Sequence, residues 1–132
     1  HLMLASLELV RRMAAGRKED LVTREDSTFG RVARYIDRHY AEDLSIEQLA
    51  RQFYLSPYHL SHIFRQKTGY SLKQYVLRRR IGEAQMRLVN AQDSVQTISE
   101  AVGFADASYF SRIFSKYVGL TPTEYRKFRI GP

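Results

Sequence analysis

The first chemistry to consider is metal binding, because His59 and His62 lie one helical turn apart. Two histidines at this spacing can share a metal ion, but a protein metal site needs further ligands, and no third ligand is evident nearby. The sequence contains no cysteine, which excludes disulfide scaffolds and thiolate zinc sites. It also lacks a glycine-rich phosphate loop and an activated-nucleophile motif. We therefore expect no enzyme, no metal site and no cofactor.

Two other short stretches carry hydrogen-bonding side chains on one helical face and apolar ones on the other. The apolar residues are Leu60, Ile63 and Phe64 in the first stretch, and Phe110, Ile113 and Phe114 in the second. The polar faces hold Tyr58, Ser61 and His62, and then Ser108, Tyr109, Ser111 and Arg112. Such a helix can anchor one side in a core and present the other to base edges in a DNA major groove. Any amphipathic helical hairpin shares this pattern, so a helical protein-interaction module stays an alternative.

Both stretches belong to an internal repeat with a separation of 49 and then 50 residues. Residues 46–50 match 95–99, and residues 60–64 match 110–114. The one-residue change falls in the turn before the second helix of each unit, where an insertion is tolerated more easily than in a packed helix. Each unit is therefore a short helix, a tight turn and a second helix.

Basic residues are concentrated after residue 27. Residues 1–27 hold five basic and five acidic side chains, so the net charge of +7 lies in residues 28–132. Between Glu47 and Glu83 there is no carboxylate, but there are seven basic residues: Arg51, Arg65, Lys67, Lys73, Arg78, Arg79 and Arg80. Such a patch attracts polyanions, and double-stranded DNA is the leading candidate. Nucleic-acid binding without sequence preference is a second alternative.

The elements that must position these residues are helices. Apolar residues recur at helical spacing, and no stretch alternates long enough to suggest a sheet. Capping boxes are predicted at Ser45–Gln48, Ser71–Gln74 and Thr121–Glu124, and further N-caps at Ser56 and Asp106. Gly69 and Gly119 suit C-terminal caps. We expect an all-α fold of about seven helices, with helix-turn-helix units at about 45–68 and 94–118 joined by a linker helix at about 71–90.

The linker helix would be roughly 30 Å long at about 1.5 Å per residue. Successive major grooves on one face of B-DNA lie about 34 Å apart. One monomer could therefore hold two reading helices one DNA turn apart and recognise a bipartite, non-palindromic site.

Residues 1–27 are set apart from this pattern. An amphipathic segment at residues 2–13 is followed by Ala14-Ala-Gly16 and a charged run to Ser27. We expect an N-terminal helix and linker, the remnant of a missing N-terminal domain, with a dimer helix as an alternative. The longest apolar run is too short to span a bilayer, so no membrane association is expected.

The most specific motifs lie between Ile98 and Arg126. They are Val102-Gly-Phe104, Ser108-Tyr-Phe-Ser-Arg-Ile-Phe114, Gly119, Thr121-Pro122 and Glu124-Tyr-Arg126, with support from Leu49-Ala50, His59-Leu-Ser61, Phe64, Thr68-Gly69, Arg80-Ile81 and Ala84. In these motifs residues 28–132 resemble the DNA-binding domain of the AraC/XylS family of bacterial transcription regulators. The resemblance implies activation or repression of transcription in the cytoplasm, contact with RNA polymerase, and a homodimer formed through a separate N-terminal domain.

The resemblance also implies roles for individual residues. Recognition helices would lie at about 57–67 and 107–117, with base contacts from Tyr58, Ser61, His62, Ser108, Tyr109, Ser111 and Arg112. DNA-backbone contacts would come from Ser45, Lys67, Ser71, Ser94 and Lys116.

Two positions depart from the family pattern. His62 stands where the family commonly has Arg, and a neutral imidazole offers one donor and one acceptor in place of bidentate guanine reading. Tyr54 occupies the turn position that Gly103 holds in the second unit, where a left-handed conformation strains a bulky residue. We therefore expect a different turn in the first unit and stronger base contacts from the second.

Overall fold

The computed structural model describes residues 24–131, and every regular element in that range is a helix. The first helix is described over residues 24–39. It is followed by α2 (Ile46–Gln52), α3 (Pro57–Thr68), α4 (Leu72–Asn90), α5 (Val95–Ala101), α6 (Ala107–Val118) and α7 (Pro122–Ile130). This confirms the all-α prediction. Of the N-terminal segment expected at residues 1–27, residues 1–23 lie outside the described range. Residues 24–27 belong to the first helix. The domain boundary at residue 28 stays a prediction.

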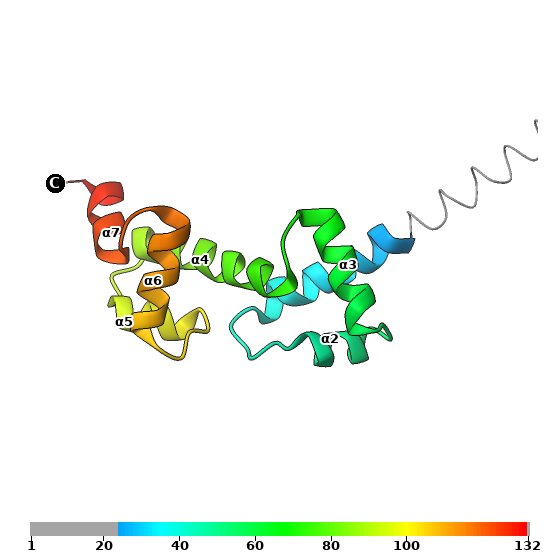
Figure 1. Cartoon of the computed structure of the whole chain (residues 1–132). Coiled ribbons are helices and arrows are strands. Elements are labelled where there is room, and N and C mark those ends of the chain that lie inside the picture. The colour runs from blue at the N-terminus through cyan, green and yellow to red at the C-terminus, as the bar shows by residue number, and fades with distance from the viewer. Residues whose placement is uncertain (1–23, 132) are drawn as a thin grey trace, which may run out of the picture.

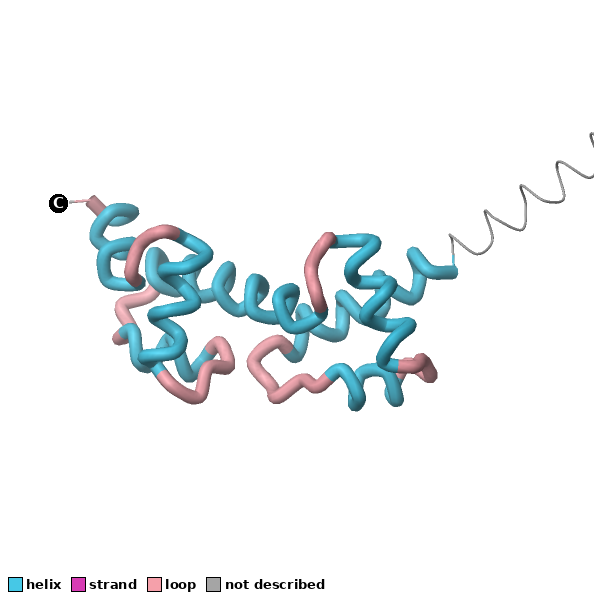
Figure 2. Tube along the Cα trace, in the orientation of Figure 1, coloured by secondary structure: helices cyan, strands magenta, loops and turns pink. Residues whose placement is uncertain are grey.

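The molecule is elongated, with one helix-turn-helix unit at each end of α4 (Figure 1). The first helix, α2 and α3 surround the N-terminal part of α4, and α5, α6 and α7 surround its C-terminal part. Short loops join consecutive helices within each unit (Figure 2). Because α4 is the one element common to both units, it sets the separation of α3 and α6.

Capping side chains explain where most of the helices begin and end. Ser71 and Thr121 form complete capping boxes with Gln74 and Glu124. The predicted box at Ser45 is only half formed, because its hydroxyl accepts from the Gln48 amide but no return bond from the Gln48 side chain is present. Ser56 and Asp106 cap α3 and α6, and Gly69 and Gly119 end these helices in the left-handed conformation.

Each unit has its own hydrophobic core. The first core contains Val32, Ile36, Leu49, Ala50, Leu60, Phe64, Leu72 and Val76. The second contains Leu77, Ile81, Ala84, Leu88, Ile98, Val102, Phe104, Phe110 and Phe114. The division falls between two consecutive residues of α4, Val76 and Leu77. The central helix is therefore buried twice, on different sides, by two separate clusters.

The turn between α2 and α3 is a correction to the sequence-based expectation. We expected Tyr54 to force a turn unlike the one at Gly103, but Tyr54 adopts a left-handed backbone conformation itself, with φ of 58°. The turn hydrogen bonds also correspond: the amides of Tyr54 and Leu55 donate to Arg51 and Ala50, as those of Gly103 and Phe104 donate to Glu100 and Ser99. The tertiary packing of the unit therefore outweighs the local preference of the tyrosine, which keeps its side chain 96% exposed.

Candidate nucleic-acid interface

The α3 helix presents a polar face opposite a fully buried one. Leu60, Ile63 and Phe64 are at most 1% exposed, which fixes the rotation of the helix about its axis. On the outer face Tyr58 is 82% exposed, and its ring is nearly parallel to that of His62, with the ring centroids 6.4 Å apart. His62 is exposed and Ser61 is half-buried. The three predicted base-contacting residues of the first unit therefore share one face.

The α6 helix repeats this arrangement with one difference. Phe110 and Phe114 are fully buried, while Ser108 and Arg112 are exposed and Ser111 is half-buried. Tyr109 is only partly accessible, because its ring packs against Phe104 with a centroid distance of 5.9 Å. The guanidinium carbon of Arg112 lies 5.9 Å from the Tyr109 ring centroid. Arg112 is thus an exposed cation of this face, and Tyr109 is a partly buried residue beside it.

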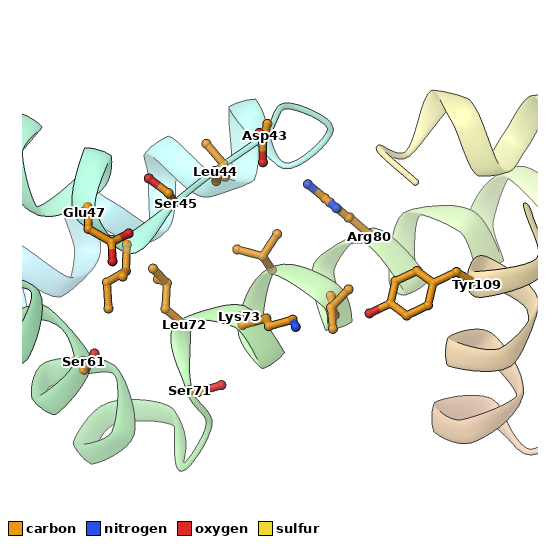
Figure 3. A pocket seen from close by; sticks show the side chains of 13 residues that line it. Asp43, Leu44, Ser45, Glu47, Ser61, Ser71, Leu72, Lys73, Arg80 and Tyr109 are labelled. Atoms are coloured by element: carbon orange, nitrogen blue, oxygen red, sulfur yellow. The ribbon is translucent and has the colours of Figure 1, made fainter. Parts of the chain in front are cut away.

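One residue of each polar face lines a common groove between the units, whereas Tyr58, His62, Ser108, Ser111 and Arg112 do not line it. Its volume is about 490 Å³, and Ser61 of α3 and Tyr109 of α6 both line it (Figure 3). The N-cap residues Ser45 and Ser71 and the side chains of Lys73 and Arg80 line it as well. Four of the predicted site residues are therefore brought together on the same side of α4.

Charges within the groove oppose one another. Lys73 and Arg80 line it together with Asp43 and Glu47 (Figure 3). A polyanion that entered the groove would meet repulsion from these carboxylates. The surfaces most open to nucleic acid are therefore the exposed faces of α3 and α6, and Lys73 with the N-cap residues Ser45 and Ser71 is the part of the groove lining that favours a phosphate.

The three serines predicted to contact the DNA backbone are all helix N-caps. The Oγ atoms of Ser45, Ser71 and Ser94 accept from the amides of Gln48, Gln74 and Thr97, at 3.1, 3.2 and 3.1 Å. A hydroxyl that accepts one bond keeps its own hydrogen to donate. Ser94 also lies 2.9 Å from Thr97 Oγ1, to which it can donate. Ser45 and Ser71 are therefore the better placed of the three to meet a phosphate oxygen.

The two predicted backbone-contacting lysines differ in their surroundings. Lys116 is exposed on α6, with its ammonium 6.0 Å from the Tyr117 ring centroid. Lys67, near the end of α3, forms an ion pair with Asp26 of the first helix. A phosphate would have to compete with that carboxylate for the Lys67 ammonium.

Three arginines of the basic patch make internal contacts, which corrects the sequence interpretation. Arg78 stacks between the rings of Tyr70 and Tyr117, with its guanidinium carbon 4.1 and 4.8 Å from the two ring centroids. Arg79 pairs with Asp37 and Glu83, at 2.5 and 3.2 Å. Arg80 donates to the carbonyl oxygens of Tyr40 and Glu42, at 2.6 and 2.7 Å. The patch that attracts a polyanion is correspondingly smaller than the run of seven basic residues indicates.

Burial and hydrogen bonding shift the pKa values of two of these arginines in opposite directions. Burial lowers the pKa of Arg80, and the nearby carboxylate of Asp43 offsets only part of this effect. Burial would also lower the pKa of Arg79, but its hydrogen bonds and charge interactions with Asp37 and Glu83 outweigh burial, and the pKa is raised. Both guanidinium groups stay charged at neutral pH, because their unperturbed pKa is far above it.

Lys73 is a candidate contact that the residue pattern did not single out. It is exposed in the first turn of α4 and lines the groove beside Ser71. The available signal was its place in the first turn of a helix, two residues after the capping Ser71 and within the carboxylate-free stretch, where a helix N-terminus and a lysine both attract an anion.

Metal-binding clusters and membrane-spanning helices are both absent from the part of the chain that the structure describes. Among residues 24–131 there is no cluster of three or more His, Cys, Asp or Glu side chains that could hold a metal ion. Within the same range, no helix has both the length and the apolar character needed to cross a membrane.

Sequence comparisons give a consistent family assignment. A family model described as a helix-turn-helix domain matches residues 49–127. The arabinose operon regulatory protein of Salmonella typhimurium is 38% identical over 119 residues, which cover 89% of this chain and 42% of that protein. The chain spans less than half the length of the first curated relatives that it matches.

Solved structures match over both units. A Chromobacterium violaceum transcriptional regulator, described as containing an AraC-type DNA-binding domain, superposes with a TM-score of 0.75 at 25% identity, covering 81% of this chain and 96% of that one. The DNA-binding domain of AdpA, a global transcriptional factor solved in complex with a target DNA, gives a TM-score of 0.72 at 26% identity, covering 75% and 89%. The likeness therefore extends to a domain of this shape captured on DNA.

Proposed function

The chain belongs to the AraC-type family of helix-turn-helix DNA-binding domains, and from this premise we propose that α3 and α6 enter successive major grooves on one face of a duplex. The family is one of sequence-specific DNA-binding domains of transcription regulators, not of enzymes. We assign no catalytic activity to the chain.

One observation carries the proposal: α3 and α6 each contribute a polar side chain to the same groove beside α4. Ser61 and Tyr109, one from each helix, line a single groove. The 19 residues of α4 correspond to about 28 Å at 1.5 Å per residue. This length is close to the separation of about 34 Å between major grooves on one face of B-DNA. The shared groove and this length support a placement of α3 and α6 on the same side of one double helix.

Base reading falls to the exposed residues of these faces. Arg112 can donate two hydrogen bonds to a guanine O6 and N7, and Ser108 and Ser111 lie on the same face of α6. On α3, Tyr58 and His62 offer aromatic surface and one or two hydrogen bonds, and Ser61 a hydroxyl. We therefore assign the stronger discrimination to the second unit, with Tyr109 holding Arg112 in place.

Backbone contacts fall to residues around these faces. Ser45 and Ser71 present N-cap hydroxyls beside the groove, and Lys73 lies next to Ser71. We assign phosphate contacts to these three, to Ser94 and to Lys116, and a weaker one to Lys67 because of its ion pair with Asp26. These contacts would hold the protein in register without reading sequence.

For the whole protein we propose regulation of transcription in the bacterial cytoplasm, through contact with RNA polymerase. The relatives are more than twice as long as the part this chain matches, and we propose that a domain outside the described residues senses a signal and forms a homodimer.

Selection of bound duplexes from a random DNA pool tests the proposal. We expect enrichment of a bipartite site with two unlike half-sites whose centres lie about one helical turn apart. In competition with unselected DNA, the affinity for the enriched site should exceed the affinity for unselected DNA by a factor of at least about 10³. Enrichment of one half-site alone would contradict the two-groove arrangement. Binding without enrichment would favour a non-specific nucleic-acid binder, and no binding would favour a protein-interaction module.

A further inference from the structure

The middle of α4 carries three consecutive arginines that point to different surroundings. Arg78 lies between two tyrosine rings, Arg79 contacts Asp37 of the first helix, and Arg80 holds two loop carbonyls. Successive residues of a helix point about 100° apart. The three arginines therefore contact neighbours on several sides of α4 within one helical turn. We call these three residues and their contacts the joint.

Two of these arginines connect the first unit to the second. Arg78 stacks on Tyr70, which follows α3, and on Tyr117, which belongs to α6. Arg80 donates to the loop that precedes α2, and its guanidinium carbon lies 5.7 Å from the ring centroid of Phe104 in the second core. Each side chain thus touches both units at once, from opposite directions around α4.

A close backbone approach completes the joint. A Cβ atom added to Gly103 would lie 2.8 Å from the Cα of Ala41 and 3.0 Å from Nε of Arg80. The loop of the first unit therefore rests directly on the turn of the second. Tyr40, in the same loop, packs against the second core.

The separate cores make these contacts important for the shape of the molecule. The two buried clusters share no residue, and α4 passes from one to the other between Val76 and Leu77. A single helix fixes the distance between its ends but can bend and twist. Contacts on opposite sides of its middle resist both motions.

We propose that Arg78 and Arg80 are positioning residues that fix the angle between α3 and α6 and thereby set the half-site spacing that the protein accepts. The proposal rests on the two-groove function above. Inserting one base pair moves the second half-site by about 3.4 Å and rotates it by about 35° around the DNA axis. A stiff joint cannot follow that rotation, whereas a loosened one can follow part of it.

The test compares binding to a series of duplexes that carry the selected half-sites with the selected spacer, one base pair fewer, and one or two more. The proteins are the full chain, Arg78→Ala, Arg80→Ala and the matched control Arg126→Ala. Arg126 donates to the carbonyls of Leu88, Ala91 and Asp93, at 2.9, 3.2 and 2.7 Å, all within the second unit. All three variants lose one positive charge, and only the first two lose a bridge between the units.

The measured quantity is the ratio of Kd on shifted spacers to Kd on the selected spacer. We expect the full chain and Arg126→Ala to have the same ratio. Arg78→Ala and Arg80→Ala should have a ratio about three- to tenfold lower, which corresponds to the loss of one cation–π contact or one charged hydrogen bond. Should Arg80→Ala fail to fold, Arg78→Ala, whose side chain is exposed, still decides the question.

An unchanged ratio in the two joint variants would overturn the inference while leaving the two-groove function intact. A ratio near one in the full chain itself would overturn both. Equal lowering in Arg126→Ala would also overturn it, because loss of stability in one unit would then account for the effect.

Discussion

Arginines in this chain serve two purposes, and the distinction lies in what surrounds each guanidinium. Arg80 donates to carbonyl oxygens of the loop before α2, and Arg126 donates to carbonyl oxygens of the loop before α5 and to that of Leu88 in α4. Arg112 is instead exposed on the polar face of α6, beside the ring of Tyr109. The first kind stabilises the protein, and the second is free to meet a ligand.

Replacing Arg112 with Ala should weaken binding to the selected site by about 1–3 kcal/mol and relax selectivity at one base pair. The reason is the loss of a bidentate contact to one base edge. Binding assays on the selected site and on its single-base variants would measure this. Lys116→Ala, on the same helix, is the control, and it should weaken all sequences alike. Uniform weakening by Arg112→Ala would assign this side chain to the DNA backbone instead.

The repeat made Arg112 predictable from the sequence, because its place on α6 follows from the matched unit. The contacts of Arg78, Arg79 and Arg80 were not predictable in this way. The hydrogen-bonding partners of Arg79 and Arg80 outside α4 lie 38 to 42 residues away, and no local pattern records which loop a distant arginine will meet. The run of three arginines therefore indicated binding of a polyanion, although two of the three form hydrogen bonds within the protein.

At the scale of the elements, two equivalent turns use different residues for the same conformation. Tyr54 has φ of 58° and is 96% exposed, whereas Gly103 has φ of 105° and lies against Ala41. A left-handed conformation costs a residue with a Cβ about 1–2 kcal/mol. The first turn therefore contains strain that the second avoids.

Exchanging the residue type at each turn should change stability in opposite directions. Tyr54→Gly should raise the free energy of unfolding by about 0.5–1 kcal/mol, because relief of strain exceeds the added freedom of the unfolded chain. Gly103→Ala should lower it by about 1–3 kcal/mol through strain and contact with Ala41. Urea unfolding followed by circular dichroism would give both values. A loss of stability in Tyr54→Gly would show that the exposed ring has a stabilising contact.

Helix boundaries were the most predictable feature, since they depend on neighbours in sequence. The hydroxyls of Ser56, Ser71 and Thr121, the carboxylate of Asp106 and the glycines after α3 and α6 act where expected. The half-formed box at Ser45 and the left-handed Tyr54 are the exceptions. Both flank α2, a helix of 7 residues that packs against α3.

At the scale of the whole molecule, the two cores should respond separately to damage. Phe64 and Phe114 occupy fully buried positions in different clusters. Phe114→Ala should lower the opening free energy of α5, α6 and α7 by about 3–5 kcal/mol, while α2 and α3 lose less than about 1 kcal/mol. Hydrogen exchange of individual amides would measure both. Phe64→Ala is the reciprocal control and should reverse the pattern; equal losses in both units would show that they unfold together.

The length of α4 was predictable from the sequence, and with it the distance between the recognition helices. The angle between them was not, because it depends on contacts between segments far apart in the chain. These include the meeting of Gly103 with Ala41 and the stacking of Arg78 on two rings.

The polar faces of α3 and α6 are built alike but carry different side chains, with His62 on one and Arg112 on the other. A symmetric dimer reads the same from either strand and has no front or back on its operator. A single copy of this domain would have both: turned end to end on the same stretch, it would offer each half-site the wrong helix. The proposed site would therefore have a direction, and a domain preceding the first helix would lie at one flank of that site and not at the other.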